Sequence, residues 1–190
     1  MTEIRFPCTV LNLISGIDMN ELDLIKSAYD CLDRVTPLAT DCGRLCAGAC
    51  CRGDGEIWLL PGEEALFESA DGFEVKKYPD GDTRVICKQS CAAYRNRRPY
   101  YCRIFPYFPR VCRQEDNSLS VRLFIDPRAA GLCPFATGVI SPDRRFAKAV
   151  RCSVRKLCES DIFYEHFLEC VQFLDEMGEF SARLFGEGDR

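Results

Sequence analysis

Four cysteines lie close together in the segment 42–51, at Cys42, Cys46, Cys50 and Cys51. Thiolates so near one another in sequence can converge on one metal at a small loop-closure cost, and the glycines between them permit tight turns. Four thiolates can hold tetrahedral zinc or an iron–sulfur cluster. Cys50 and Cys51 are adjacent and point in different directions, so they could serve two metals or two ends of one cluster.

Cysteines further along the chain could supply remote ligands. They are Cys87, Cys91, Cys102, Cys112 and Cys133. The two groups together exceed the four ligands of one simple site. Two sites, one polynuclear site, and one site accompanied by working thiols are therefore all open at this point.

The other cysteines and the histidine limit the chemistry further. We expect five cysteines to pack as small hydrophobic side chains in or beside helices, namely Cys8, Cys31, Cys152, Cys158 and Cys170. The chain has 14 cysteines but one histidine. That residue, His166, cannot build a three-His or two-His-plus-carboxylate centre, and it is the one candidate base for a catalytic triad. The expected site is therefore all thiolate, unless carboxylate or water completes it.

The segment 94–106 joins arginines with tyrosines and prolines around Cys102. Arginine beside a thiolate favours the deprotonated, metal-binding form. We therefore predict that Arg98 and Arg103 lie around the site and hydrogen-bond backbone or thiolate. A basic surface loop or a contact for single-stranded nucleic acid is the alternative interpretation, but the formal net charge of −4 disfavours nucleic acid as a partner.

The order of these motifs resembles the CxxCxxCC family of zinc- or iron-chelating, YkgJ-like proteins. In that family a cysteine cluster precedes a helix start with proline and acids, and a series of Cys, Tyr, Arg-Pro, Cys-Arg and Pro follows. The matching runs here are Cys42–Cys51, Leu60–Ala65 and Cys91–Pro106. The resemblance covers roughly residues 42–109. Three residues separate each of the first cysteines, where the family often has two, and one extra residue lies between Tyr94 and Arg98.

A second similarity extends further along the chain. Phe108-Pro109-Arg110 and Leu132-Cys133-Pro134 are similar to the arrangement in flagellin lysine N-methylases, which carry a related cysteine motif. Those enzymes are linked to an iron–sulfur cluster and S-adenosylmethionine, so this similarity favours iron–sulfur over zinc. The chain is much shorter than those enzymes, so the methylase activity is not carried over.

Residues and resemblances together predict a protein that binds a metal ion or cluster through thiolates. The expected ligands are Cys42, Cys46, Cys50, Cys51, Cys87, Cys91, Cys102 and Cys133. The expected cofactor is an iron–sulfur cluster (4Fe-4S), with zinc as the alternative. Two other functions stay open, a cluster-dependent redox or group-transfer enzyme and a zinc-binding regulatory or metal-handling protein. We interpret Glu63 and Glu64 as charges at a helix start rather than as acid–base catalysts.

Helices at the two ends and a small β element between them must position these residues. The expected elements are a helix at 20–35, a glycine-rich loop at 41–55, a helix start at 61–67, a hairpin of 73–78 and 83–87, an ordered irregular segment at 91–113, a strand at 119–125, and helices at 142–159 and 160–185. The predicted fold class is α+β and mostly helical, with irregular central loops stapled by metal and with C-terminal helices. We expect a single domain over 1–190, with a cysteine-rich region at 42–133 and a C-terminal helical part at 142–185.

Length and composition are those of a globular protein that can bury one core, with 190 residues, 47 % hydrophobic and 28 % charged. The N-terminal segment has an acid at Glu3 and a short, interrupted apolar run, unlike a signal peptide. No apolar run approaches the roughly 18 residues of a transmembrane helix. We therefore expect a cytoplasmic protein with no membrane partner, in a compartment where thiols stay reduced. The sequence predicts no particular protein partner.

Overall fold

The computed structural model describes residues 19–38, 42–51, 55–79, 81–88 and 97–185. Its α-helices are α1 (Met19–Leu32), α2 (Gly43–Cys46), α3 (Tyr100–Ile104), α4 (Arg144–Leu157) and α5 (Asp161–Phe185). Its strands are β1 (Ile57–Trp58), β2 (Phe73–Lys77), β3 (Thr83–Cys87), β4 (Tyr107–Arg113) and β5 (Leu119–Ile125). The short 3-10 helices are η1 (Ala49–Cys51), η2 (Glu63–Leu66), η4 (Pro127–Ala129) and η5 (Pro134–Thr137). The predicted α+β class is confirmed.

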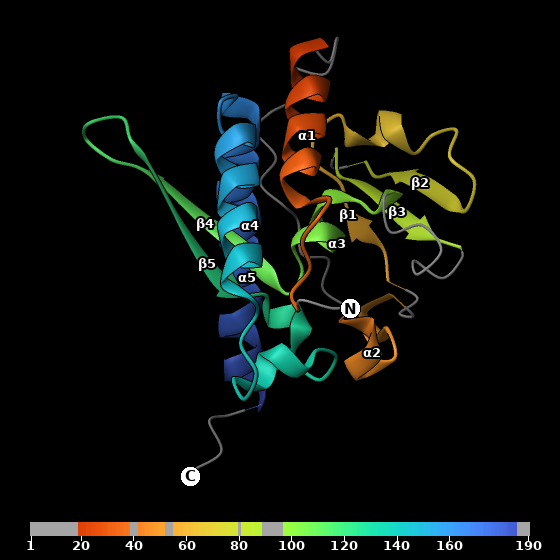
Figure 1. The fold of residues 1–190 in the computed structure, drawn as a ribbon, viewed down its shortest axis with the longest axis vertical. Coiled ribbons are helices and arrows are strands. Elements are labelled where there is room, and N and C mark those ends of the chain that lie inside the picture. Colours follow the sequence, from red (N-terminus) through yellow and green to blue (C-terminus); the bar gives the residue numbers. More distant parts are fainter. Residues whose placement is uncertain (1–18, 39–41, 52–54, 80, 89–96, 186–190) are drawn as a thin grey trace.

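The strands form two separate antiparallel sheets. In the first, β3 lies between β1 and β2, and Val85 of β3 is aligned with both Ile57 and Val75. In the second, β4 pairs with β5 along their whole length. In Figure 1, α1, α4 and α5 run along the long axis of the molecule, with the three-stranded sheet on one side and the β4–β5 hairpin on the other.

The predicted hairpin of 73–78 and 83–87 is confirmed as β2 and β3. Its turn is closed by the N–H of Tyr78 donating to the carbonyl of Asp82, at 2.9 Å, and by that of Gly81 donating to Tyr78. Gly81 has a φ of 88°, a left-handed conformation that glycine adopts at little cost. The Pro-Asp-Gly-Asp signal in the sequence therefore predicts this turn for the right physical reason.

The prediction of an irregular segment at 91–113 is wrong for its described part. This part holds α3 and then β4, which pairs residue by residue from Tyr107 with Ile125 to Arg113 with Leu119. The prolines of this segment suggested irregular backbone. Pro109 is tolerated in β4 because both strands of a two-stranded ribbon are edge strands, where a missing N–H need not break a ladder.

The predicted terminal helices are confirmed with shorter ends. The first one ends at Leu32 rather than at residue 35, and the last two are α4 and α5. Helix α4 buries one stripe at helical spacing, made of Phe146, Val150, Val154 and Leu157. Helix α5 does the same with Phe163, Phe167, Val171 and Leu174, while Met177, at the end of the predicted stripe, is 46 % exposed.

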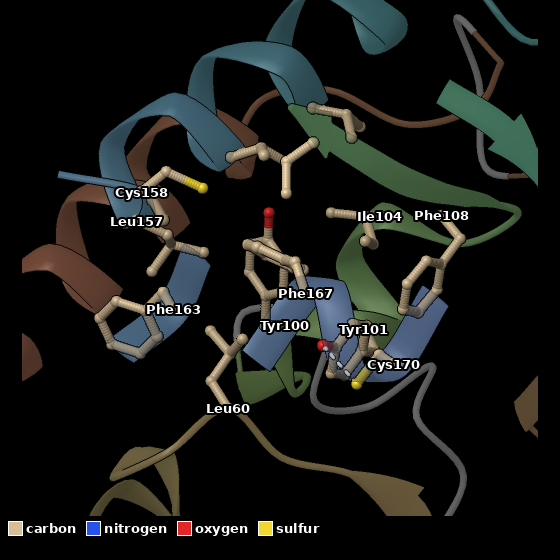
Figure 2. Packing of buried hydrophobic residues seen from close by; sticks show 14 of the residues in the cluster. Leu60, Tyr100, Tyr101, Ile104, Phe108, Leu157, Cys158, Phe163, Phe167 and Cys170 are labelled. Carbon is tan, nitrogen blue, oxygen red and sulfur yellow. Dashed lines mark hydrogen bonds between the residues drawn. The ribbon is translucent and has the colours of Figure 1, made fainter. Parts of the chain in front are cut away.

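The core is centred on tyrosine and phenylalanine rings contributed by helices and by β4. Figure 2 shows Tyr100 of α3 among Leu60, Leu157 and Phe167, with its hydroxyl pointing into the cluster. That hydroxyl hydrogen-bonds Ser153 of α4 at 2.9 Å, so the one polar atom of the ring is satisfied. The core thus contains α3 as a central element, although this helix is only one turn long.

Of the five cysteines predicted to pack as hydrophobic side chains, two are buried, one is half-buried, one is exposed and one lies outside the described residues. Cys158 and Cys170 are buried, and the Sγ of Cys170 lies 3.7 Å from the hydroxyl of Tyr101 (Figure 2). Cys31 is half-buried, and Cys152 is exposed because it is not among the buried apolar residues of α4. Cys8 lies outside the described residues.

None of the helices in the described ranges combines the length and the apolar composition needed to cross a bilayer.

Phe167→Ala should destabilise the protein strongly, because it removes a ring that is fully buried against the tyrosines of α3. Loss of a buried phenylalanine ring costs about 3–5 kcal/mol of unfolding free energy. The measurement is chemical denaturation followed by circular dichroism. The next residue, Leu168, is 37 % exposed, so Leu168→Ala is the matched control, expected within about 0.5 kcal/mol of wild type. Equal effects of the two substitutions would contradict this packing.

Candidate metal centre

The first cysteine group is brought together by a short helix and a left-handed turn. Cys42 is the N-terminal capping residue of α2, and Cys46 is its last residue. The next two residues, Ala47 and Gly48, have φ values of 49° and 70°. This turn reverses the chain, and the N–H of Gly48 donates to the carbonyl of Gly43 at 3.0 Å. Helix η1 then begins at once and returns Cys50 toward the two preceding thiols.

A remote thiol comes from α3, which has two functionally different faces. Tyr100, Tyr101 and Ile104 point into the core and are buried. Cys102 lies on the other side of the same turn, and the chain leaves α3 through Phe105 and Pro106. Because the buried face of α3 is held by the core, the positions of Cys102 and Arg103 on the same helix are fixed as well.

The third contribution comes from the loop after β5. Cys133 precedes η5, and its N–H donates to the carbonyl of Ala129 at 2.9 Å. Its carbonyl accepts from the N–H of Ala136, also at 2.9 Å. Burial raises the pKa of the Cys133 thiol, the N–H of Phe135 acts in the opposite direction, and the nearby Cys46 raises it further. Cys133 and Cys46 are therefore neighbours although they lie on different segments.

All three segments meet at one cavity of about 310 Å³. The cysteines that line it are Cys42, Cys46, Cys50, Cys102 and Cys133. The remaining wall is largely apolar and includes Leu32 at the end of α1, Val35, Phe105 and Phe135. Five of the eight predicted ligands thus share a single cavity, to which all three segments contribute.

Arg98 and Arg103, the two predicted arginines, also line this cavity. The side chain of Arg103 is 6 % exposed, and its Nε donates to the carbonyl of Arg98 at 2.7 Å. Its Nη1 donates to Asp33 at 2.7 Å, and its guanidinium lies 3.8 Å from the ring centre of Tyr29. The predicted hydrogen bond from Arg103 to backbone is therefore present, and it orders the approach to α3.

Glu63 lies in the first turn of η2, as the sequence predicted, but it also has a structural role that the sequence did not predict. It is fully buried, and its Oε2 accepts from the N–H of Leu60 at 2.8 Å. Its Oε1 accepts from the N–H of Tyr100 at 2.6 Å and from the hydroxyl of Tyr29. Burial raises the pKa of Glu63 to about 7, against the opposing effect of these donors and of Arg103. The acid at this position is thus a structural anchor that holds the first residue of α3.

Three of the predicted ligands are not brought to the cavity by the described residues. Cys87 is the last residue of β3, is aligned with Phe73 of β2 and is not part of the cavity lining. The side chain of Cys51 and all of Cys91 lie outside the described residues. Among the side chains that the structure does describe, no three His, Cys, Asp or Glu residues form a group that could hold a metal ion.

Sequence reasoning missed the residues that hold Arg103 and α3 in place. Tyr29 was expected to be an ordinary member of an apolar helix stripe, and Asp33 carried no signal at all. Both residues contact partners that are distant in the sequence. Tyr29 bonds to Glu63, 34 residues away, and Asp33 bonds to Arg103, 70 residues away. One available signal was the tyrosine itself, because a Tyr in a buried stripe needs a partner for its hydroxyl.

The donor set of this cavity suits a metal that prefers sulfur. Thiolates select zinc and iron–sulfur clusters over magnesium or calcium, which take oxygen. Two guanidinium groups at the wall offset the negative charge that several thiolates would bring. The cysteines whose side chains are described form no disulfide with one another in the structure, and the thiolate is the form of cysteine that binds metal.

Comparisons of the chain with protein-family models, with curated proteins and with solved structures find no match.

Glu63→Ala should lower the unfolding free energy by about 3–5 kcal/mol, because it leaves three buried donors without an acceptor and opens a cavity. The measurement is denaturation in urea at pH 7. Glu68, in an exposed ion pair with Lys77, gives the control Glu68→Ala, which should change stability little. A Glu63→Ala variant as stable as that control would show that the carboxylate is not an anchor.

Proposed function

We propose that this chain binds an iron–sulfur cluster, most simply of the 4Fe-4S type, in the cavity between α2, α3 and η5. The observation that carries the proposal is the convergence of Cys42, Cys46, Cys50, Cys102 and Cys133 on one cavity. Ligands from a compact cysteine run plus remote segments are typical of such clusters. Cys51 and Cys91 stay candidate ligands, and Cys87 has the weakest case because of its place in the sheet.

The size of the cavity favours a cluster over a single ion. Zinc with four thiolates at about 2.3 Å draws its ligands around itself and needs no open space. The volume here is about 310 Å³, at the lower end of the range of about 300–1,000 Å³ for small-ligand sites. The resemblance to YkgJ-like proteins allows zinc or iron, and the similarity to the methylases favours iron–sulfur.

The residues around the thiols have definable roles in this proposal. Arg103 is fixed by Asp33 and Tyr29, so its charge stays beside the thiolates at little entropic cost. The apolar wall keeps water from part of the cavity, which strengthens the interaction between the guanidinium groups and anionic sulfur. A bound cluster would supply electron transfer or a Lewis-acidic iron. Such chemistry fits a reducing compartment such as the cytoplasm.

A cluster-dependent enzyme is the second candidate, and one observation favours it. The side chains of Leu32, Phe105 and Phe135 share the wall of the cavity with the thiols, so an apolar surface lies where a small substrate could bind. A cluster held by three thiolates would leave one iron open beside this apolar surface, whereas a closed set of four favours structure or electron transfer. Counting the ligands by spectroscopy separates the two.

Cys102→Ser should lose most of the bound iron and sulfide, because it removes the thiol that α3 presents to the cavity. The measurement is elemental analysis with a visible absorption spectrum on anaerobically purified protein. Cys112 is exposed on β4, away from the cavity, so Cys112→Ser is the matched control and should keep its metal. A colourless wild-type protein with stoichiometric zinc would refute the cluster, and a metal-free one would refute the site.

Removal of the metal by a chelator should destabilise the middle of the chain, because a metal that links α2, α3 and η5 contributes its binding free energy to folding. The expected result is a lower Tm and faster proteolysis within 42–133. The metal-depleted Cys42→Ser/Cys102→Ser double variant serves as the control and should not respond to the chelator. Unchanged Tm and cleavage in wild type after complete metal removal would contradict a structural role.

A further inference from the structure

A second sulfur site lies outside the cavity, where α1 packs against α4. The Sγ atoms of Cys31 and Cys152 are 3.0 Å apart, although 121 residues separate the two in sequence. The two helices run antiparallel, because the chain just after the end of α1 meets the start of α4. The N–H of Asp143, which caps α4, donates to the carbonyl of Pro37 at 2.8 Å. Cys31 lies six residues before Pro37, and Cys152 lies nine residues after Asp143, so the two cysteines come to a similar height along the pair of helices.

The geometry of this contact is close to that of a covalent bond. A disulfide has an S–S distance of about 2.05 Å, so the two sulfurs need to approach by about 1 Å. Neither thiol lines the cavity of the candidate metal centre.

The surroundings of the two thiols differ in a way that assigns them separate roles. Cys152 is exposed and accessible to reagents, whereas Cys31 is half-buried. Burial and the hydrogen bond with Cys152 raise the pKa of Cys31 to about 11. Lys156 lies near both sulfurs and forms an ion pair with Glu159, while Asp30 lies near Cys31. The exposed Lys148 and Arg155 add positive charge to the helix that carries Cys152. An anionic reagent is therefore attracted to Cys152 first.

We propose that Cys31 and Cys152 form a reversible intramolecular disulfide by exchange with an anionic low-molecular-mass disulfide, such as oxidised glutathione. The Cys152 thiolate attacks one reagent sulfur and breaks the reagent S–S bond, which releases one reagent thiol and leaves a mixed disulfide. The Cys31 thiolate then attacks the Cys152 sulfur and releases the second reagent thiol. Two protein thiols are oxidised, one reagent disulfide is reduced to two thiols, and the protons of the protein thiols end on those products.

The bond would link α1 to α4 at Cys31, the residue that immediately precedes two lining residues of the cavity in the sequence. Leu32 and Asp33, which follow Cys31, line the cavity, and Asp33 holds Arg103. Oxidation would thus restrain the segment that positions this arginine, while leaving the cavity thiols untouched. The inference does not depend on which metal the cavity binds.

The test is peptide mapping after incubation of the purified holoprotein with oxidised glutathione and alkylation of remaining thiols. Trypsin releases Cys31 in the peptide 27–34 and Cys152 in the peptide 152–155. The expected product is these two peptides joined, with a mass lower by two hydrogen atoms than their sum, and reversed by dithiothreitol. In Cys31→Ser, the peptide 152–155 should instead carry a stable glutathione adduct.

Two controls keep the result interpretable. The exposed thiol of Cys112 reports that the reagent is active, and Cys112→Ser should still form the 31–152 bond. Oxidised wild type should gain about 5–10 °C in Tm, since the bond closes a long loop, and Cys31→Ser should gain nothing. Modification of Cys112 without joined peptides, or pairing of Cys31 with another cysteine, would overturn the proposal. Metal content measured on the same samples reports on the metal centre separately.

Discussion

The carboxylate of Glu63 is fully buried, and its two oxygens accept hydrogen bonds from three separate parts of the chain. A carboxyl group in such a place is tolerated only when its hydrogen-bond partners are present, since the desolvation that raises its pKa to about 7 is otherwise unopposed. Tyr29, Leu60 and Tyr100 are therefore held in one arrangement relative to each other. Through Tyr100 this arrangement sets the start of α3, and through Tyr29 it sets the ring on which Arg103 stacks.

Helix α3 transmits this constraint to the cavity because it is too short to have an independent position. Its five residues place two tyrosines in the core and Cys102 in the cavity wall. The other two sulfur-bearing segments, 42–51 and the loop at Cys133, contribute little to the core. The cavity thus has one rigid side, built on the core, and other sides whose backbone is fixed mainly by local turns.

Much of the fold was predictable because its signals are local. The Pro-Asp-Gly-Asp turn gave the β2–β3 hairpin, and the apolar spacing of Phe163 and Phe167 gave the buried stripe of α5. The β4 strand was not predictable in the same way, because Pro106 and Pro109 imitate a loop unless the strand is known to be an edge. For the site, cysteine spacing and arginine content predicted five cysteines and two arginines that line the cavity, together with Cys87, which lies in the sheet instead. The anchors Tyr29, Asp33 and Glu63 act across long sequence separations, and local patterns carry no information on such pairs.

The order in which the cavity thiols occur along the chain has a consequence for biosynthesis. Cys133 is the last of them, and it is followed by α4 and α5, which supply much of the core around α3. Since chains emerge from the ribosome N-terminus first, the early thiols of 42–51 exist for some time without their remote partners. Under the proposed function, a cluster that needs all three segments would be completed only after the core around α3 has formed, and that core includes residues of the C-terminal helices.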